Sequence, residues 1–256
     1  MSEGLNLTNV TMRFGGLTAV GALNAIVGPH DLIGLIGPNG AGKTTVFNMI
    51  TGVYTPTEGS VTFNGISLSG KRPSEISGIG IARTFQNIRL FKGMTVWDNI
   101  RVSMTSRVSN KVWGSIFRGP GFFREEKETA KKIEDLLELF QLQDVRDEMA
   151  TSLPYGDQRR LEIVRALATN PKLLLLDEPA AGMNPSEKQN LMKLIKQIRD
   201  QFQIGVLLIE HDMRLVMGIC ERILVLDYGV KIAEGSPHEI IENPKVVEAY
   251  LGEVKK

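Results

Sequence analysis

The chain has 256 residues, 42% of them hydrophobic and 23% charged, a composition typical of a folded globular protein and too apolar for a disordered one. Its 30 basic and 29 acidic residues leave a net charge of +1, which gives no reason to expect nucleic acid as a partner. A single cysteine, Cys220, excludes an internal disulfide, and its apolar neighbours predict a buried core residue.

The N-terminal residues lack the basic-then-apolar layout of a signal peptide. No apolar run approaches the roughly 20 residues that span a bilayer. We therefore expect any work at a membrane to depend on a partner that spans it.

Taken in chain order, the first elements alternate loosely between apolar and polar residues. The segments "LNLTNVTMRFG" (5–15) and "GSVTFNG" (59–65) predict antiparallel strands. Later strands are continuous apolar runs, which is typical of parallel strands buried on both faces. These runs are 32–37, 173–179, 206–211 and 223–227.

Helices separate the apolar runs. Asn184, Pro185 and Glu187 form a capping box that predicts the start of a helix, and Ser236 to Glu239 predicts another near the C-terminus. From about Asn99 to Asp147 the pattern is helical, with "AKKIEDLLELFQL" its clearest amphipathic piece. The predicted fold is α/β, with a mainly parallel sheet, an antiparallel β flank and an inserted helical part.

The segment "GPNGAGKT" fits G-x-x-x-x-G-K-[ST] and lies between a predicted strand and a predicted helix. Glycines allow backbone N–H groups to approach phosphate oxygens, and the helix N-terminus adds its positive end. The motif predicts a nucleoside triphosphate site and disfavours a simple glycine-rich turn, but it does not say which nucleotide binds. The predicted binding residues are Gly37, Pro38, Asn39, Gly40, Ala41, Gly42, Lys43, Thr44 and Thr45.

Two carboxylates follow the run "LLLL". At the end of a buried strand beside a phosphate loop, Asp177 is expected to hold Mg²⁺ through water, together with the Thr44 hydroxyl. Glu178 is expected to orient and deprotonate the attacking water. The alternative is a solvated acidic turn.

The stretch "LPYGDQRRLEIVRALATNPKLLLLDEPAAGMNP" (153–185) resembles the signature, Walker B and D-loop block of ABC-type ATPases. The order of motifs along nearly the whole chain matches that family. The resemblance implies a single ABC ATPase domain, with a nucleotide-binding core at about 1–98 and 160–256. A helical subdomain at about 99–159 would end in the signature motif.

The resemblance also implies residue roles. Phe14 matches the aromatic that stacks on adenine. Gln86 matches the glutamine that touches Mg²⁺ and the attacking water and lies at the transmembrane contact. His211 matches the switch histidine at the γ-phosphate. ATP and Mg²⁺ are the implied cofactors.

The signature departs from the common Leu-Ser-Gly-Gly-Gln form. It reads Leu153, Pro154, Tyr155, Gly156, Asp157, Gln158. Proline has neither the hydroxyl nor an N–H to offer the partner's γ-phosphate, a loss of roughly 1.5–3 kcal/mol if nothing compensates. Asn184 also replaces the usual aspartate of the D-loop.

Several segments, including "DEPAAGMNP" and "ENPKVVEAYLGE", resemble the LivG-type ATPases of branched-chain amino acid importers. That resemblance implies a second ATPase subunit (identical or paralogous), two permease subunits and, indirectly, a solute-binding protein. It places the chain at the cytoplasmic face of the plasma membrane, without nucleic acid.

Alternatives are the ATPase of lipopolysaccharide export, a small-molecule P-loop kinase, a non-transport ABC protein and a cassette that binds ATP without hydrolysis. The aromatic residues of the insert are read as helical-subdomain core or, alternatively, as a membrane contact. They are Trp113, Phe117, Phe122 and Phe123.

Overall fold

The computed structural model describes residues 3–105 and 120–251. The chain divides into two compact units. The first, called unit 1 here, comprises residues 1–83 and 172–256, and the second, unit 2, comprises residues 84–171. Within the described ranges, no helix has the length and apolar character needed to cross a bilayer.

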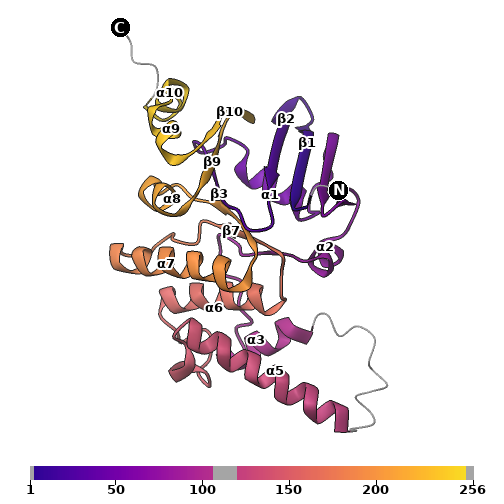
Figure 1. Cartoon of the computed structure of the whole chain (residues 1–256), viewed down its shortest axis with the longest axis vertical. Coiled ribbons are helices and arrows are strands. Elements are labelled where there is room, and N and C mark those ends of the chain that lie inside the picture. The colour runs from indigo at the N-terminus through magenta and orange to yellow at the C-terminus, as the bar shows by residue number, and fades with distance from the viewer. Residues whose placement is uncertain (1–2, 106–119, 252–256) are drawn as a thin grey trace. The chain divides into compact units, whose positions relative to one another are not determined.

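The larger sheet of unit 1 has the strand order β10-β9-β3-β8-β7-β6. Figure 1 labels four of these strands, β3, β7, β9 and β10. Neighbouring strands are parallel except β10, which runs antiparallel to β9. Strands β3, β7 and β8 are buried along their whole length, which explains their unbroken apolar sequences and confirms the predicted parallel sheet. The bounds are Leu32–Ile36 (β3), Ile81–Arg83 (β6), Leu173–Asp177 (β7), Gly205–Ile209 (β8), Arg222–Asp227 (β9) and Val230–Gly235 (β10).

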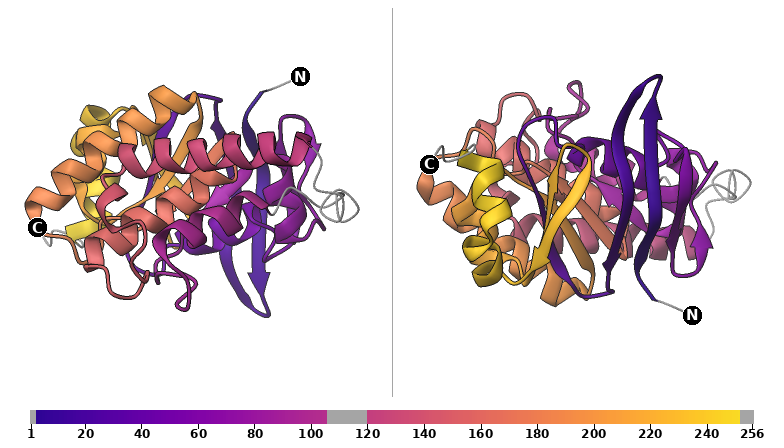
Figure 2. Two further views of the ribbon diagram at one scale, coloured as in Figure 1. Left: turned by 90° about the horizontal axis from the view of Figure 1, so that it is seen from below. Right: turned by 90° about the horizontal axis from the view of Figure 1, so that it is seen from above.

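The second sheet of unit 1 is antiparallel, with the order β2-β1-β4-β5. Its two long strands, β1 and β2, lie side by side in indigo in Figure 2. Bulges interrupt their register, which lets the strands twist. This sheet is the predicted antiparallel flank. Its bounds are Leu5–Phe14 (β1), Leu17–Val27 (β2), Glu58–Phe63 (β4) and Ile66–Ser67 (β5).

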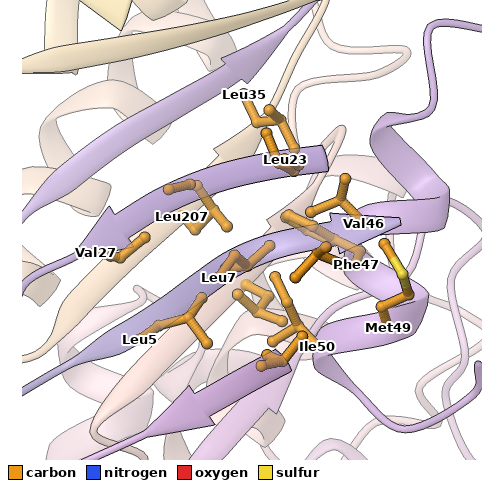
Figure 3. Packing of buried hydrophobic residues seen from close by; sticks show 14 of the residues in the cluster. Leu5, Leu7, Leu23, Val27, Leu35, Val46, Phe47, Met49, Ile50 and Leu207 are labelled. Carbon is orange, nitrogen blue, oxygen red and sulfur yellow. The ribbon is translucent and has the colours of Figure 1, made fainter. Parts of the chain in front are cut away.

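The core of unit 1 forms where helix α1 (Lys43–Ile50) meets both sheets. Figure 3 shows Phe47 and Ile50 of α1 among leucines that the two sheets contribute. Phe47 and Ile50 are fully buried. This packing fixes the helix that follows the phosphate loop, because interiors this dense tolerate little displacement.

Two other helices of unit 1, α7 and α9, begin where the sequence predicts. Asn184 and Glu187 form a reciprocal capping box at the start of α7, and Ser236 and Glu239 do so at α9. A new helix, α10, follows α9 after Asn243, because Pro244 cannot continue the preceding helix. The bounds are Pro73–Ile79 (α2), Pro185–Phe202 (α7), Met213–Ile219 (α8), Pro237–Glu242 (α9) and Pro244–Leu251 (α10).

The regular elements described in unit 2 are helices. Helices α3 (Val96–Thr105) and α5 (Pro120–Leu139) pack against α6 (Tyr155–Ala168), and a short 3₁₀ turn lies at Gln143–Val145 (η1). Residues 130–139 of the predicted amphipathic segment form the C-terminal half of α5, which buries Ile133 and Leu137, and residues 140–142 lie beyond the helix. Trp113 and Phe117 lie outside the described residues, as do the side chains of Phe122 and Phe123.

Candidate functional site

The phosphate loop joins β3 to α1 in unit 1, and two of its glycines are required by the backbone. Gly37 has φ +150°, and a Cβ there would lie 2.0 Å from the Leu226 carbonyl oxygen. Gly42, at φ +99°, caps α1, and a Cβ there would lie 2.5 Å from the Ala19 carbonyl oxygen. Any side chain at either position would displace main chain, so both glycines set the path of the loop.

Lys43 opens helix α1 and is buried, with 9% of its surface exposed. Its Nζ donates to the carbonyl oxygens of Gly37 (2.7 Å) and Pro38 (2.9 Å) and so lies across the loop. Burial lowers the pKa of this ammonium, and the nearby carboxylates of Glu178 and Asp177 oppose that shift. The result is a cation held at the loop by the residues around it.

The rest of the loop leaves polar groups accessible. Asn39, Gly40 and Thr44 are exposed, while Thr45 is half-buried and Ala41 is buried. The first amides of a helix have no partner within the helix, so the start of α1 presents donors together with the positive end of the helix dipole. An anion that reaches this exposed turn meets N–H groups, hydroxyls and the Lys43 charge.

Asp177 ends strand β7 and is only 4% exposed. Its Oδ2 accepts from Nη2 of Arg83 at 2.8 Å, a buried ion pair with 6% of each side chain exposed. Sequence reasoning missed Arg83, since an arginine near the end of a short strand carries no local signal. The carboxylate is thus paired and held at the end of its strand.

Glu178 follows with a left-handed backbone, φ +48°, a region that costs a non-glycine residue roughly 1–2 kcal/mol. Its N–H donates to the Ile209 carbonyl at 2.9 Å, which ties the turn to β8. The Glu178 side chain is 21% exposed, and its Oε2 lies 3.8 Å from Nδ1 of His211, a side chain that is 61% exposed. The structure therefore brings these two predicted residues together at an accessible edge.

Glu210 is a further residue that sequence reasoning missed. It is fully buried, and its carboxylate accepts from the backbone N–H groups of Ala180 (2.8 Å) and His211 (3.1 Å). Burial raises its pKa, and those backbone donors oppose the rise. The Glu210 carboxylate thus holds together the segment after Glu178 and the segment that carries His211. In the sequence, Glu210 is only a polar residue after an apolar strand, so nothing there indicates this role.

Phe14 ends strand β1 and is 41% exposed. Its ring meets Tyr54 edge to face, with centroids 5.2 Å apart and planes at 75°. An edge contact steadies a ring while leaving part of its surface accessible. Phe14 is therefore placed as an exposed aromatic platform and not as a core residue.

The donor set suits Mg²⁺ that arrives with a nucleotide. Among the residues described, no group of three or more His, Cys, Asp and Glu side chains could hold a metal ion. The available oxygens are the exposed Thr44 hydroxyl and the Asp177 carboxylate. Mg²⁺ in proteins usually keeps several waters and takes one or two carboxylates plus substrate phosphates, so these residues fit it.

The predicted signature belongs to unit 2, where it forms the start of α6. Leu153 is buried, and Pro154 lies at the N-cap, where a missing N–H removes no helical bond. The amide of Gln158 donates back to the Leu153 carbonyl at 2.8 Å. Gly156 and Asp157 lie half-buried in the first turn, so donors here come from the helix backbone.

Unit 2 also holds Gln86, whose backbone is bound by α6. Arg159, 2% exposed, donates to the carbonyl oxygens of Phe85 (2.7 Å) and Gln86. Glu162 accepts from the N–H of Phe85 at 3.2 Å and pairs with Arg159 at 3.1 Å. The Tyr155 hydroxyl accepts from Nε of Arg159 at 3.2 Å, which gives this unusual signature residue a structural role. We call Arg159 and Glu162 the α6 clamp.

Comparisons with known proteins find matches along most of the chain. Residues 20–181 match the family model described as ABC transporter, and residues 230–256 match that of the branched-chain amino acid ATP-binding cassette transporter. The chain is 45% identical over 249 residues to the high-affinity branched-chain amino acid transport ATP-binding proteins BraF of Pseudomonas aeruginosa and LivG of Escherichia coli K12. In each case the match covers 97% of this chain and 98% of the relative. The lipopolysaccharide export ATP-binding protein LptB of Haemophilus influenzae is 31% identical over 97% of each chain.

Solved structures give the same result for the fold. A nucleotide-free ATP-binding cassette from an ABC transporter is similar with a TM-score of 0.84 and 33% identity, covering 98% of this chain and all of that one. A dimeric cassette bound to ADP and phosphate is similar with a TM-score of 0.75 and 25% identity, covering 91% of this chain and 98% of that one.

Proposed function

Because this chain belongs to the ATP-binding subunits of ABC transporters, we propose that it binds and hydrolyses ATP to drive uptake of leucine, isoleucine and valine through separate permease subunits. The match of the C-terminal residues to the branched-chain amino acid cassette model supports this substrate class. The higher identity to BraF and LivG than to LptB favours amino acid import over lipopolysaccharide export.

The observation that carries the proposal is the cluster in unit 1. A buried lysine lies across a glycine loop, and the Glu178 carboxylate lies 3.8 Å from His211. Phosphoryl chemistry needs a cation at the phosphates and a group that positions water, and this cluster offers both. A glycine loop without a neighbouring carboxylate could bind phosphate, but it would have no general base for hydrolysis.

ATP is bound by the loop amides and by Lys43, whose charge meets the β- and γ-phosphates. Phe14 stacks on the adenine, and Thr45 donates to the α-phosphate. Thr44 and Asp177 (through water) would hold Mg²⁺, which on binding would neutralise the developing phosphate charge.

Hydrolysis follows from the residues at the end of β7. Glu178 takes the proton of the attacking water while His211 holds the γ-phosphate. The Glu210 carboxylate keeps the His211 backbone in place at 3.1 Å. The signature of a second ATPase subunit completes the site, an arrangement supported by the dimeric cassette to which this chain is similar.

The subunit would work at the cytoplasmic face of the plasma membrane, held there by two permease subunits, with a solute-binding protein delivering the amino acid. Gln86, exposed in unit 2, is proposed to lie at the permease contact. ATP binding and release would thus change the permease conformation, as in other switches governed by a γ-phosphate.

The test is Glu178→Gln in the complex with its permeases. Phosphate release should fall by about 10²–10⁴-fold, the usual contribution of a general base, while ATP affinity is retained. Glu248→Gln, an exposed carboxylate on α10, is the matched control and should turn over normally. Turnover of the Glu178 variant at the wild-type rate would remove Glu178 as the base.

The substrate is tested separately, in proteoliposomes that contain the permeases and the binding protein. ATP-dependent uptake of labelled leucine, isoleucine and valine is expected. Failure of uptake combined with stimulation of the ATPase by lipopolysaccharide would assign the chain to the export system instead.

A further inference from the structure

Arg83 joins the Asp177 carboxylate to helix α1 inside unit 1. Its Nη2 donates to Oδ2 of Asp177 at 2.8 Å. Its Nη1 donates to Oδ1 of Asn48 at 2.8 Å and to the hydroxyl of Thr51 at 3.3 Å. One guanidinium therefore bonds the end of strand β7 and the helix that follows the phosphate loop.

The surroundings of Arg83 make this contact specific. The Arg83 and Asp177 side chains are each 6% exposed, and the guanidinium carbon lies 5.4 Å from the centre of the Phe47 ring in α1. Solvent screening of the pair is therefore weak, and the carboxylate has little freedom to leave. A planar fork with several donors can serve two acceptors in different directions, which a lysine ammonium on a flexible stem does less well.

The bonded partners are parts of the proposed metal site. Helix α1 begins with Lys43 and Thr44, and β7 ends with Asp177. The distance between Thr44 and Asp177 therefore depends on how α1 is held against β7. In metal sites, partners that orient a ligand contribute strongly to affinity, and their loss typically costs 10–100-fold.

We propose that Arg83 is a positioning residue for Mg²⁺ binding, because it fixes the Asp177 carboxylate and holds α1 at the correct distance from it. This inference rests on the proposed role of Asp177 as a metal ligand. In this proposal Arg83 acts without contacting the nucleotide or the metal. Its contribution passes through Asp177 and through the placement of Thr44.

The experiment measures equilibrium binding and not turnover. In the full chain carrying Glu178→Gln, ATP binding is followed by calorimetry while Mg²⁺ is titrated. Arg83→Met should raise the Mg²⁺ concentration for half-maximal binding by about 10–100-fold, with a far smaller effect on ATP bound without metal. Arg83→Lys should fall between the parent and the methionine variant, because it restores the charge without the fork.

A second variant separates the two bonds of Arg83. Asn48→Ala removes an acceptor on α1 and leaves the ion pair with Asp177, so its effect on Mg²⁺ should be smaller than that of Arg83→Met. The matched control is Arg222→Met. Arg222 pairs with Asp31 at 2.9 Å elsewhere in unit 1 and should leave the Mg²⁺ dependence unchanged.

Asp177→Asn distinguishes the inference from the function on which it rests. If Asp177→Asn leaves the Mg²⁺ dependence unchanged, the proposed metal role of Asp177 is wrong. If it weakens Mg²⁺ binding but Arg83→Met does not, the role of Arg83 is wrong. In the Asp177→Asn background, Arg83→Met should add less than twofold.

Thermal unfolding without metal completes the set. If both Arg83 variants lower the melting temperature while their Mg²⁺ dependence stays within about twofold of the parent, Arg83 is merely structural and the inference fails. Should the methionine variant not fold, Arg83→Lys and Asn48→Ala still decide the question by the same Mg²⁺ titration.

Discussion

Replacing Arg159 by methionine tests how strongly the α6 clamp holds the backbone near Gln86. The substitution keeps much of the side-chain volume but removes four bonded contacts, to Phe85, Gln86, Glu162 and Tyr155. Arg159 and Glu162 side chains are only 2% and 6% exposed, so water cannot readily replace the arginine. Breaking such a buried pair costs about 3–5 kcal/mol.

For a chain of this length, that loss corresponds to a melting temperature lower by about 6–20 °C. Urea titrations followed by circular dichroism measure the loss directly. Arg160→Met is the control, because Arg160 is the next residue on α6 and its pair with Asp157, at 3.4 Å, is part-exposed. Its cost should stay below about 1 kcal/mol.

The pH dependence gives an independent check. Burial raises the pKa of Glu162, with the Phe85 N–H and the Arg159 charge opposing it. A carboxyl with a raised folded-state pKa favours folding when protonated, and that stabilisation is lost as pH rises from its unfolded value through the raised one. Without Arg159 the pKa rises further, so the deficit of the methionine variant should be smaller at pH 5 than at pH 8.

A second substitution measures the cost of leaving the buried Glu162 carboxylate without its Arg159 partner. Adding Glu162→Gln to Arg159→Met should recover about 1 kcal/mol or more, because the amide keeps one acceptor without a buried charge. The reasoning is refuted if Arg159→Met lies within about 1 kcal/mol of wild type, or if the two substitutions are strictly additive at pH 8.

Further predictions concern the phosphate loop and the buried Cys220 thiol. Gly37→Ala should destabilise the nucleotide-free protein strongly, since its Cβ would lie 2.0 Å from the Leu226 carbonyl. Gly15→Ala, also at positive φ but with nothing within 4 Å, should cost only about 1 kcal/mol; equal melting temperatures would contradict this. Burial raises the pKa of Cys220 to about 12, so at pH 8 its reaction with a thiol reagent should be about a thousandfold slower than in urea, and rapid native labelling would contradict it.

The sequence predicted the elements whose signals are local. Strand β3 and the loop after it were found because an unbroken apolar run, glycines and a lysine follow one another within a dozen residues. The helix starts at Asn184 and Ser236 were found because a capping box spans four residues. The break between α9 and α10 was not foreseen, although Pro244 marks it.

Contacts between residues far apart in the chain could not be predicted from the sequence. Arg83 and Asp177 are 94 positions apart, and Arg159 is 74 positions from Phe85. An arginine looks like a solvated residue until the fold buries it beside an acceptor. Glu210 escaped for a related reason, because its backbone partners are supplied by turns whose shape no residue pattern encodes.

The left-handed backbone at Glu178 has a consequence for engineering. Selection for heat tolerance alone would favour Glu178→Gly, since glycine adopts that conformation without the steric penalty of a Cβ. Because Glu178 is the proposed base, cassettes enriched in this way are expected to fold better and to lose ATP hydrolysis. Screens for thermostable members of this family should therefore measure phosphate release as well as thermal stability. Otherwise they will select proteins in which a relaxed backbone at position 178 has replaced the proposed base.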